Sequence, residues 1–141
     1  MINSDRNFLE GFTLVGMMIT LAIIVTLAVI AIPNLIRARM TANESAARAT
    51  LKTVAVALET HAAKTGLGYP EDFSSLTETE PPYLNNNYIA ESPLQGYNYV
   101  CDSLSATSYS CSAIPQICNQ TGSKTYTVTA GAVFSEKQCT P

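Results

Sequence analysis

The chain has little charge and no excess of basic residues. Charged residues make up 13% of its 141 positions, and its formal net charge at pH 7 is −3. General binding to nucleic-acid phosphates needs a strongly basic surface, so we expect no nucleic acid as a partner. With 47% hydrophobic residues the chain is too apolar for a disordered segment. Its length fits one modest domain.

The N-terminal region contains a long stretch without charge. No Asp, Glu, Lys, Arg or His occurs in the 26 positions 11–36. As a helix, this stretch is about 39 Å long and exceeds the roughly 30 Å hydrocarbon core of a bilayer. We therefore expect residues 12–36 to form a transmembrane half-helix. Residues 1–11 are too short and too polar for an ordinary secretory signal, and a cut after Gly11 would remove them as a leader while leaving the apolar segment on the mature protein.

The helix is expected to continue as an amphipathic half over residues 37–66. Apolar residues recur there at the spacing of one helix face, which is predicted to be buried: Met40, Ala47, Leu51, Val54, Leu58 and Ala62. The opposite face carries charged residues, namely Arg39, Glu44, Arg48, Lys52 and Glu59. Pro33 has no backbone N–H and predicts a kink, whereas Gly66 suits a left-handed helix cap.

The C-terminal part is expected to form a small sheet. Residues 67–95 are rich in Tyr, Pro, Ser, Thr and Asn, and we expect a connector loop with one short helical turn. Three segments have the composition of strands: 96–101, 108–114 and 125–133. The predicted fold class is α+β, a long kinked N-terminal helix packed on a three- or four-stranded antiparallel sheet.

All four cysteines lie in the last third of the chain, at Cys101, Cys111, Cys118 and Cys139. They lack the closely spaced pairs of structural zinc sites, so two disulfides are favoured over a metal site. Of the three possible connectivities we favour Cys101 with Cys111 across the first hairpin, and Cys118 with Cys139 around the last strand. Disulfides persist in oxidising compartments, so residues 96–141 are expected to form a disulfide-stapled sheet in the periplasm or outside the cell.

The N-terminal segment resembles that of type IV pilins and type II secretion pseudopilins. The resemblance rests on the string GFTL at positions 11–14, the charge-free helix that follows, and AIPN at positions 31–34. It implies that a prepilin peptidase cuts after Gly11 and methylates Phe12. It also implies a single-pass precursor in the bacterial inner membrane with a periplasmic head. An assembly platform and its ATPase motor would then lift such subunits out of the membrane lipid into a cell-surface or periplasmic filament of homologous subunits.

One departure from this family lies at Gly16. The family places a glutamate there, the fifth residue after the cut, and its carboxylate is thought to pair with the free amine of a neighbouring subunit. The expected assembly residues are therefore Phe12, Gly16 and Pro33. A subunit without the acid can present its amine to another subunit but cannot dock through an acid of its own. This favours a minor subunit at the filament tip. Secretion, motility and DNA uptake are not separated by these residues.

Other functions have little support in the sequence. His61 is the only histidine, and no motif places a nucleophile beside it, so we expect neither an enzyme nor a cofactor. Acidic residues gather in the connector without the spacing of a calcium loop, and we expect a solvated acidic loop: Glu71, Asp72, Glu78, Glu80 and Glu91. The rival reading is a membrane-tethered binding module, either a receptor or a DNA-uptake minor pilin, although the acidic balance argues against DNA.

Overall fold

The structure is a computed structural model that describes residues 14–140. By its internal contacts the chain divides into two compact units, Met1–Ile36 and Arg37–Pro141. The first helix contributes to both units. The sheet, the connector and the second half of that helix belong to the second unit, which we call the head.

Helix α1 spans Leu14–Thr65, a length of 52 residues, and Pro33 lies inside it. The head portion of the helix is rich in alanine, the residue with the highest helix propensity. The helix ends at Gly66, whose φ of 65° lies in the left-handed region. The Gly66 amide donates to the Ala62 carbonyl at 3.0 Å. The expected glycine cap is therefore confirmed, whereas the bend expected at Pro33 stays a prediction.

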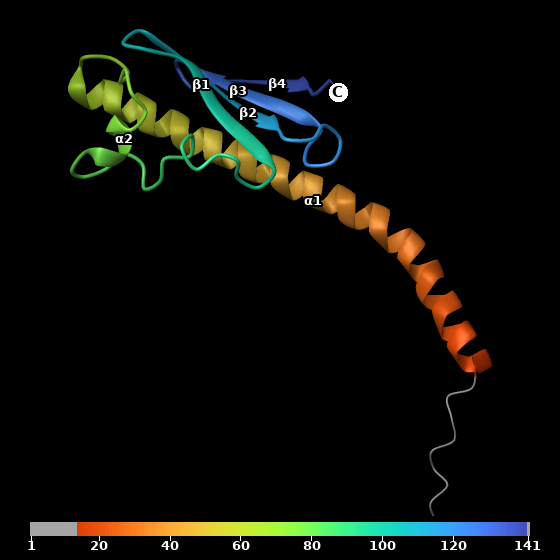
Figure 1. Cartoon of the computed structure of the whole chain (residues 1–141). Coiled ribbons are helices and arrows are strands. Elements are labelled where there is room, and N and C mark those ends of the chain that lie inside the picture. Colours follow the sequence, from red (N-terminus) through yellow and green to blue (C-terminus); the bar gives the residue numbers. More distant parts are fainter. Residues whose placement is uncertain (1–13, 141) are drawn as a thin grey trace, which may run out of the picture. The chain divides into compact units, whose positions relative to one another are not determined.

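Four antiparallel strands form one sheet in the order β1-β2-β3-β4, each hydrogen-bonded to its neighbour in sequence (Figure 1). The strands are β1 Tyr97–Ser105, β2 Ser108–Pro115, β3 Lys124–Thr129 and β4 Val133–Gln138. Short connections join each strand to the next, so every neighbouring pair is antiparallel. The predicted α+β class, a long helix packed on an antiparallel sheet, is confirmed.

The single strand expected over residues 125–133 was wrong. This segment contains most of β3, a turn, and the first residue of β4. The turn includes Gly131 and Ala132, with φ values of 78° and 54°. Such left-handed conformations reverse the chain tightly between two strands. Alanine rarely adopts a positive φ, so its presence in the sequence gives no sign of this turn.

The hydrophobic core lies between the inner face of the sheet and the head portion of α1. Four of the six apolar residues predicted to face the core are buried: Ala47, Leu51, Val54 and Leu58. Met40 and Ala62 are half-buried. The sheet contributes mainly tyrosines, which alternate with outward-facing residues along the strands: Tyr97, Tyr99, Tyr109 and Tyr126. The periodicity of the helix therefore predicted its buried face.

The connector is packed against the same core. Helix α2, Ser75–Glu78, is the short helical turn that the sequence predicted. Leu76 of α2 is completely buried, and Phe73 and Leu84 are buried on either side of it. The backbone amides of Tyr83 and Leu84 both donate to the Leu76 carbonyl, at 2.9 and 3.0 Å. These contacts fold the connector over α2.

Candidate functional site

The first candidate site is the apolar half of α1, residues 14–36. Its large apolar side chains are exposed, from 46% at Ile36 to 76% at Leu14. In the part of the chain that the structure describes, α1 is the one helix long and apolar enough to cross a membrane. So large an exposed apolar surface needs a lipid or protein partner.

Polar side chains in this half of α1 are satisfied by the helix itself. The hydroxyls of Thr20 and Thr26 donate to the carbonyls of Met17 and Ile23, at 2.9 and 2.8 Å. Asn34 donates through Nδ2 to the Ile30 carbonyl at 3.1 Å. Because these donors need no water, the half-helix can lie in lipid or against other apolar helices without leaving them unpaired.

The predicted processing residues, Gly11 and Phe12, lie outside the described residues. Of the predicted assembly residues, Gly16 and Pro33 lie inside α1, and the first turn of the helix contains no acidic residue. Pro33 has no N–H for the carbonyl four residues earlier, that of Val29. The resemblance implies that a glutamate of one subunit pairs with the free amine of its neighbour. This part of α1 supplies no such acid.

Two disulfides lie in the head. Cys101 and Cys111 face each other in the register of β1 and β2 and are joined. Cys118 is joined to Cys139, which follows β4, and so ties the end of the chain to the loop between β2 and β3. The expectation of two disulfides is confirmed. Such bonds persist in oxidising compartments, so they indicate an extracytoplasmic head.

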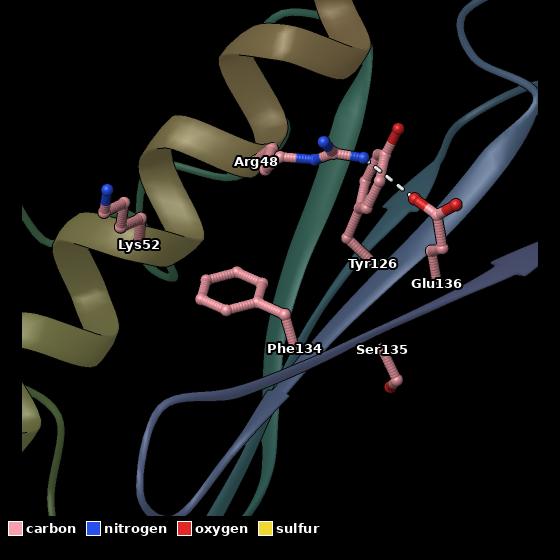
Figure 2. A pocket seen from close by; sticks show the side chains of 6 residues that line it. All are labelled: Arg48, Lys52, Tyr126, Phe134, Ser135 and Glu136. Atoms are coloured by element: carbon pink, nitrogen blue, oxygen red, sulfur yellow. Dashed lines mark hydrogen bonds and ion pairs between the residues drawn. The ribbon is translucent and has the colours of Figure 1, made fainter.

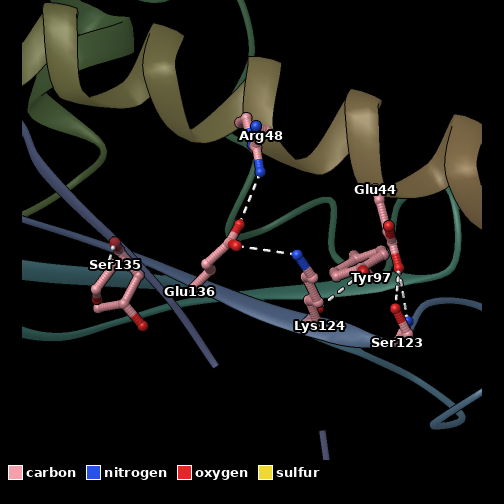
Figure 3. Close-up of polar contacts among 8 residues, drawn as sticks. Glu44, Arg48, Tyr97, Ser123, Lys124, Ser135 and Glu136 are labelled. Carbon is pink, nitrogen blue, oxygen red and sulfur yellow. Dashed lines mark hydrogen bonds and ion pairs between the residues drawn. The ribbon is translucent and has the colours of Figure 1, made fainter. Parts of the chain in front are cut away.

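Two carboxylates of α1 hold the sheet onto the helix. Glu44 accepts hydrogen bonds through Oε1 from the Ser123 amide at 2.8 Å and the Ser123 hydroxyl at 2.6 Å (Figure 3). Asn43 donates through Nδ2 to the Thr121 carbonyl at 2.9 Å. Nearer the end of α1, Glu59 accepts from groups of the connector, of β2 and of the turn between β3 and β4.

The expectation that Glu44 and Glu59 belong to a separate polar face was wrong. Glu44 lies three residues before the buried Ala47, and Glu59 lies four residues after the buried Ala55. Side chains three and four residues apart on a helix are neighbours, so both glutamates flank the buried face and can reach the sheet. The signal that could have identified them is this spacing.

Arg48 also reaches the sheet. Glu136 lies opposite Tyr126 in the register of β3 and β4, on the side of the sheet that meets α1. Its Oε2 accepts from Arg48 at 2.8 Å, and its Oε1 accepts from Nζ of Lys124 at 2.9 Å (Figure 3). The Lys124 ammonium lowers the pKa of the Glu136 carboxyl, and Arg48 lowers it further. Arg48 and Glu136 are exposed and Lys124 is half-buried, so their pairing adds little stability.

The buried tyrosines retain their protons. Burial raises the pKa of Tyr97 and of Tyr109 well above the ordinary value of 10.0. The Tyr97 hydroxyl donates to the Lys124 carbonyl at 2.9 Å, and the Tyr109 hydroxyl donates to Oε1 of Glu59 at 3.1 Å. Both hydroxyls are therefore permanent donors that join core side chains to polar groups at the edge of the core.

His61 makes a structural contact. Its Nδ1 lies 3.3 Å from the Gly68 carbonyl, which can only accept, so the hydrogen bond requires a hydrogen on Nδ1. Its ring meets Tyr83 edge-on, with centroids 5.4 Å apart. Among the described residues, no group of three or more His, Cys, Asp or Glu side chains is placed to hold a metal ion. The arrangement around His61 links the end of α1 to the connector.

Two open hollows lie on either side of Lys52. The first, of about 430 Å³, is bounded by Arg48 and Lys52 of α1 and by Tyr126, Phe134, Ser135 and Glu136 of the sheet (Figure 2). The second, of about 590 Å³, extends along α1 from Lys52 past Val56 to Lys64, and Pro82 and Tyr83 of the connector form its other wall. Cationic and apolar side chains thus lie together along one strip of the head.

No protein-family model matches the chain, and a search of curated proteins finds no significant relative. What the structure itself establishes is a pilin-like architecture: a long apolar N-terminal helix that continues beneath a four-stranded antiparallel sheet.

Proposed function

We propose that the chain is a structural subunit of a type IV pilus or a type II secretion pseudopilus. One observation carries this proposal. A single helix, Leu14–Thr65, exposes apolar side chains along its first half and buries a regular apolar face beneath the sheet in its second half. A plain membrane anchor has no need for a helix that is also the core of the head. A filament subunit needs both halves.

The resemblance at positions 11–14 supplies the processing step of this proposal. A prepilin peptidase removes residues 1–11 and methylates Phe12. Until assembly, the apolar half-helix lies in the inner membrane with the head in the periplasm. An assembly platform and its ATPase motor then move the subunit into the filament, where other apolar helices replace lipid around it. The role of the chain is assembly, without catalysis.

The test is the intact mass and N-terminal sequence of the protein, purified from bacterial cells that supply the peptidase and the platform. The expected mature chain begins at methylated Phe12 and is found in filaments sheared from the cells. Cells that lack the peptidase are the control and should retain the chain starting at Met1. A chain that still starts at Met1 when the peptidase is active would contradict the proposal.

Because position 16 is a glycine, this subunit could occupy either of two places in the filament. Without a glutamate at this position, the subunit either stands at the tip or draws its attraction to neighbours from elsewhere, including the head. The copy number per filament, measured by quantitative mass spectrometry, separates the two. About one copy per filament supports the tip, and copy numbers that rise with filament length support incorporation along it.

A further inference from the structure

Positive and negative charges are separated within the head. The α1 residues 37–65 contain five arginines and lysines and only two acids, Glu44 and Glu59. Both of these acids are bound to groups of the sheet and its loops. The connector, residues 67–95, contains five acids and no lysine or arginine. The exposed side of α1 is therefore positive and the connector is negative.

Most of this charge has no opposite partner within residues 14–140, the part of the chain that the structure describes. Among the described residues, the ion pairs join Glu136 to Arg48 and Lys124. Neither Lys52 nor any acid of the connector takes part in one. Lys52 and the acids of the connector thus lack an opposite charge among these residues, and the cationic strip and the acidic segment are complementary to each other.

The cationic strip also has the shape and apolar content of a docking surface. We call it the Lys52 face and define it by Arg48, Lys52, Val56 and Lys64 of α1 with Phe134 of β4. Val56 is 56% exposed and Phe134 is 41% exposed. Lys52 lines both hollows, of about 430 and 590 Å³, and Figure 2 shows the first of them. A partner that fits this face offers carboxylates beside apolar groups.

We propose that the Lys52 face binds the acidic connector of a second copy of this chain. The best match in the connector is the segment 78–81, where Glu78 and Glu80 are exposed and the exposed ring of Pro81 follows. It offers two carboxylates to the cations and one ring to the hollows, and it leaves out Pro82, which bounds the second hollow of its own chain. This inference rests on the proposed function, because assembly is what brings two heads side by side.

A contact between two different surfaces of identical chains is heterologous. In a row of copies joined in this way, the first copy keeps one of the two surfaces free and the last copy keeps the other. Such a contact repeats without closing unless the rotation between copies makes a ring. Because each chain carries both surfaces, the contact favours incorporation along the filament over a single place at its tip. It also supplies electrostatic attraction between subunits that Gly16 does not.

The direct test is cross-linking between two full-length copies with different tags. One copy carries Lys52→Cys and the other Glu80→Cys, and a bismaleimide joins thiols that lie close together in assembling cells. The four native cysteines are already paired and do not react. The matched control replaces Lys52→Cys with Lys137→Cys, another exposed lysine, which lies on β4 outside the Lys52 face. We expect at least about fivefold more mixed dimer from the Lys52 pair, since the remaining charges and apolar groups of the proposed contact hold these positions together.

Charge reversal gives a second, independent readout. Lys52→Glu, or Glu78→Lys with Glu80→Lys, is expected to lower the amount of subunit in sheared filaments by several-fold. Combining the reversed Lys52 with the reversed acids should restore it, whereas Lys137→Glu should change little. Because the attraction is between exposed charges, the mixed dimer should also decrease as salt is raised toward 1 M.

Two tagged wild-type copies separate the possible failures. If neither copy is found in sheared filaments, the proposed function fails and this inference fails with it. If both are found in filaments but do not copurify, as expected for a single tip subunit, the proposed function stands and the inference is overturned. If they copurify, the proposed function stands, and two results would overturn the inference. One is cross-linking at position 52 that does not exceed that at position 137. The other is a failure of the combined charge reversals to restore assembly. If the Lys52→Cys copy is cross-linked only to proteins other than a second copy of this chain, the inference is overturned as well.

Discussion

Oε1 of Glu59, in α1, lies 2.7 Å from the backbone nitrogen of Gly131, in the turn between β3 and β4. The same oxygen accepts from the Ala132 amide at 3.2 Å and from the Tyr109 hydroxyl at 3.1 Å. The Tyr69 hydroxyl donates to both carboxylate oxygens. One side chain of the helix therefore joins the connector, β2 and the last turn of the sheet.

Glu59→Gln is expected to destabilise the head, because the neutral amide accepts these hydrogen bonds more weakly and offers one acceptor atom instead of two. Hydrogen bonds to a charged group contribute about 1.5–3 kcal/mol, so a loss of about 2 kcal/mol in the free energy of unfolding is expected. Urea unfolding of the full chain in detergent, followed by near-ultraviolet circular dichroism, measures it. Glu71→Gln, at an exposed acid of the connector, is the control and should stay within about 0.5 kcal/mol of wild type. Equal effects of the two substitutions would contradict the role of Glu59.

Stability is expected to fall at alkaline pH. Burial raises the pKa of Tyr97 and Tyr109 above the 10.0 of an ordinary tyrosine, so the folded head binds these protons more tightly than the unfolded chain does. Their contribution is fully present below pH 10 and is lost as pH rises from there toward the folded pKa. Each tyrosine contributes a slope of about 1.4 kcal/mol per pH unit in that range.

Tyrosinate absorbance and far-ultraviolet circular dichroism, recorded together in an alkaline titration, test this slope. The two signals of the buried tyrosines should change in one step, because ionisation accompanies unfolding. Tyr109→Phe should reduce the slope by about 1.4 kcal/mol per pH unit, since it removes one of the shifted groups. A head that ionises completely while its circular dichroism stays constant would contradict the effect of burial.

Gly122→Ala is expected to destabilise the head through one steric contact. A Cβ at this position would overlap the hydroxyl of the buried Tyr97, and its neighbouring ring atoms lie 2.6 and 2.8 Å away. Overpacking of this kind typically costs about 1–3 kcal/mol. Thermal unfolding of wild type, both single variants and the double variant with Tyr97→Phe measures it. The double variant should recover part of the loss, because Phe lacks the atom that lies closest. Strictly additive effects would contradict a direct clash.

The helix and its buried face were predictable because they depend on local patterns. The absence of charge over positions 11–36 predicts an apolar helix from that segment alone. The recurrence of residues such as Leu51 and Leu58 likewise predicts the buried face of a helix from its own segment. The glycine cap at Gly66 is equally local. Alternation of Tyr97, Tyr99 and Cys101 placed the start of β1 for the same reason, since side chains in a strand point alternately to its two faces.

Contacts between distant segments were not predictable in the same way. The turn at Gly131 and Ala132 is stabilised by amide hydrogen bonds to Glu59, which is 72 residues from Gly131 in sequence. Within its own segment, the string YTVTAGAVF reads as one strand. Similarly, Glu136 contacts Arg48 because pairing of β4 with β3 places it beside Tyr126, and this register is a property of the folded sheet.

The two disulfides are expected to contribute unequally. Cys101 and Cys111 are 10 residues apart and already face each other in paired strands, whereas Cys118 and Cys139 are 21 residues apart. In the loop-entropy model the shorter bridge contributes about 2.7 kcal/mol and the longer one about 3.3 kcal/mol. The longer bridge also holds Cys139 where its amide donates at 3.0 Å to the carbonyl of Ser123, the same residue that Glu44 binds.

Replacing Cys118 and Cys139 by serine should therefore lower the melting temperature more than replacing Cys101 and Cys111 does. Calorimetry of the full chain in detergent compares the two double variants. Hydrogen exchange adds a local readout, because β4 is an edge strand whose far end is attached through Cys139. Its amides should lose protection in the Cys118/Cys139 variant, while those of β1 and β2 keep theirs. Equal loss of protection in all four strands would mean that the bridge stabilises the head as a whole and does not act by holding its last strand.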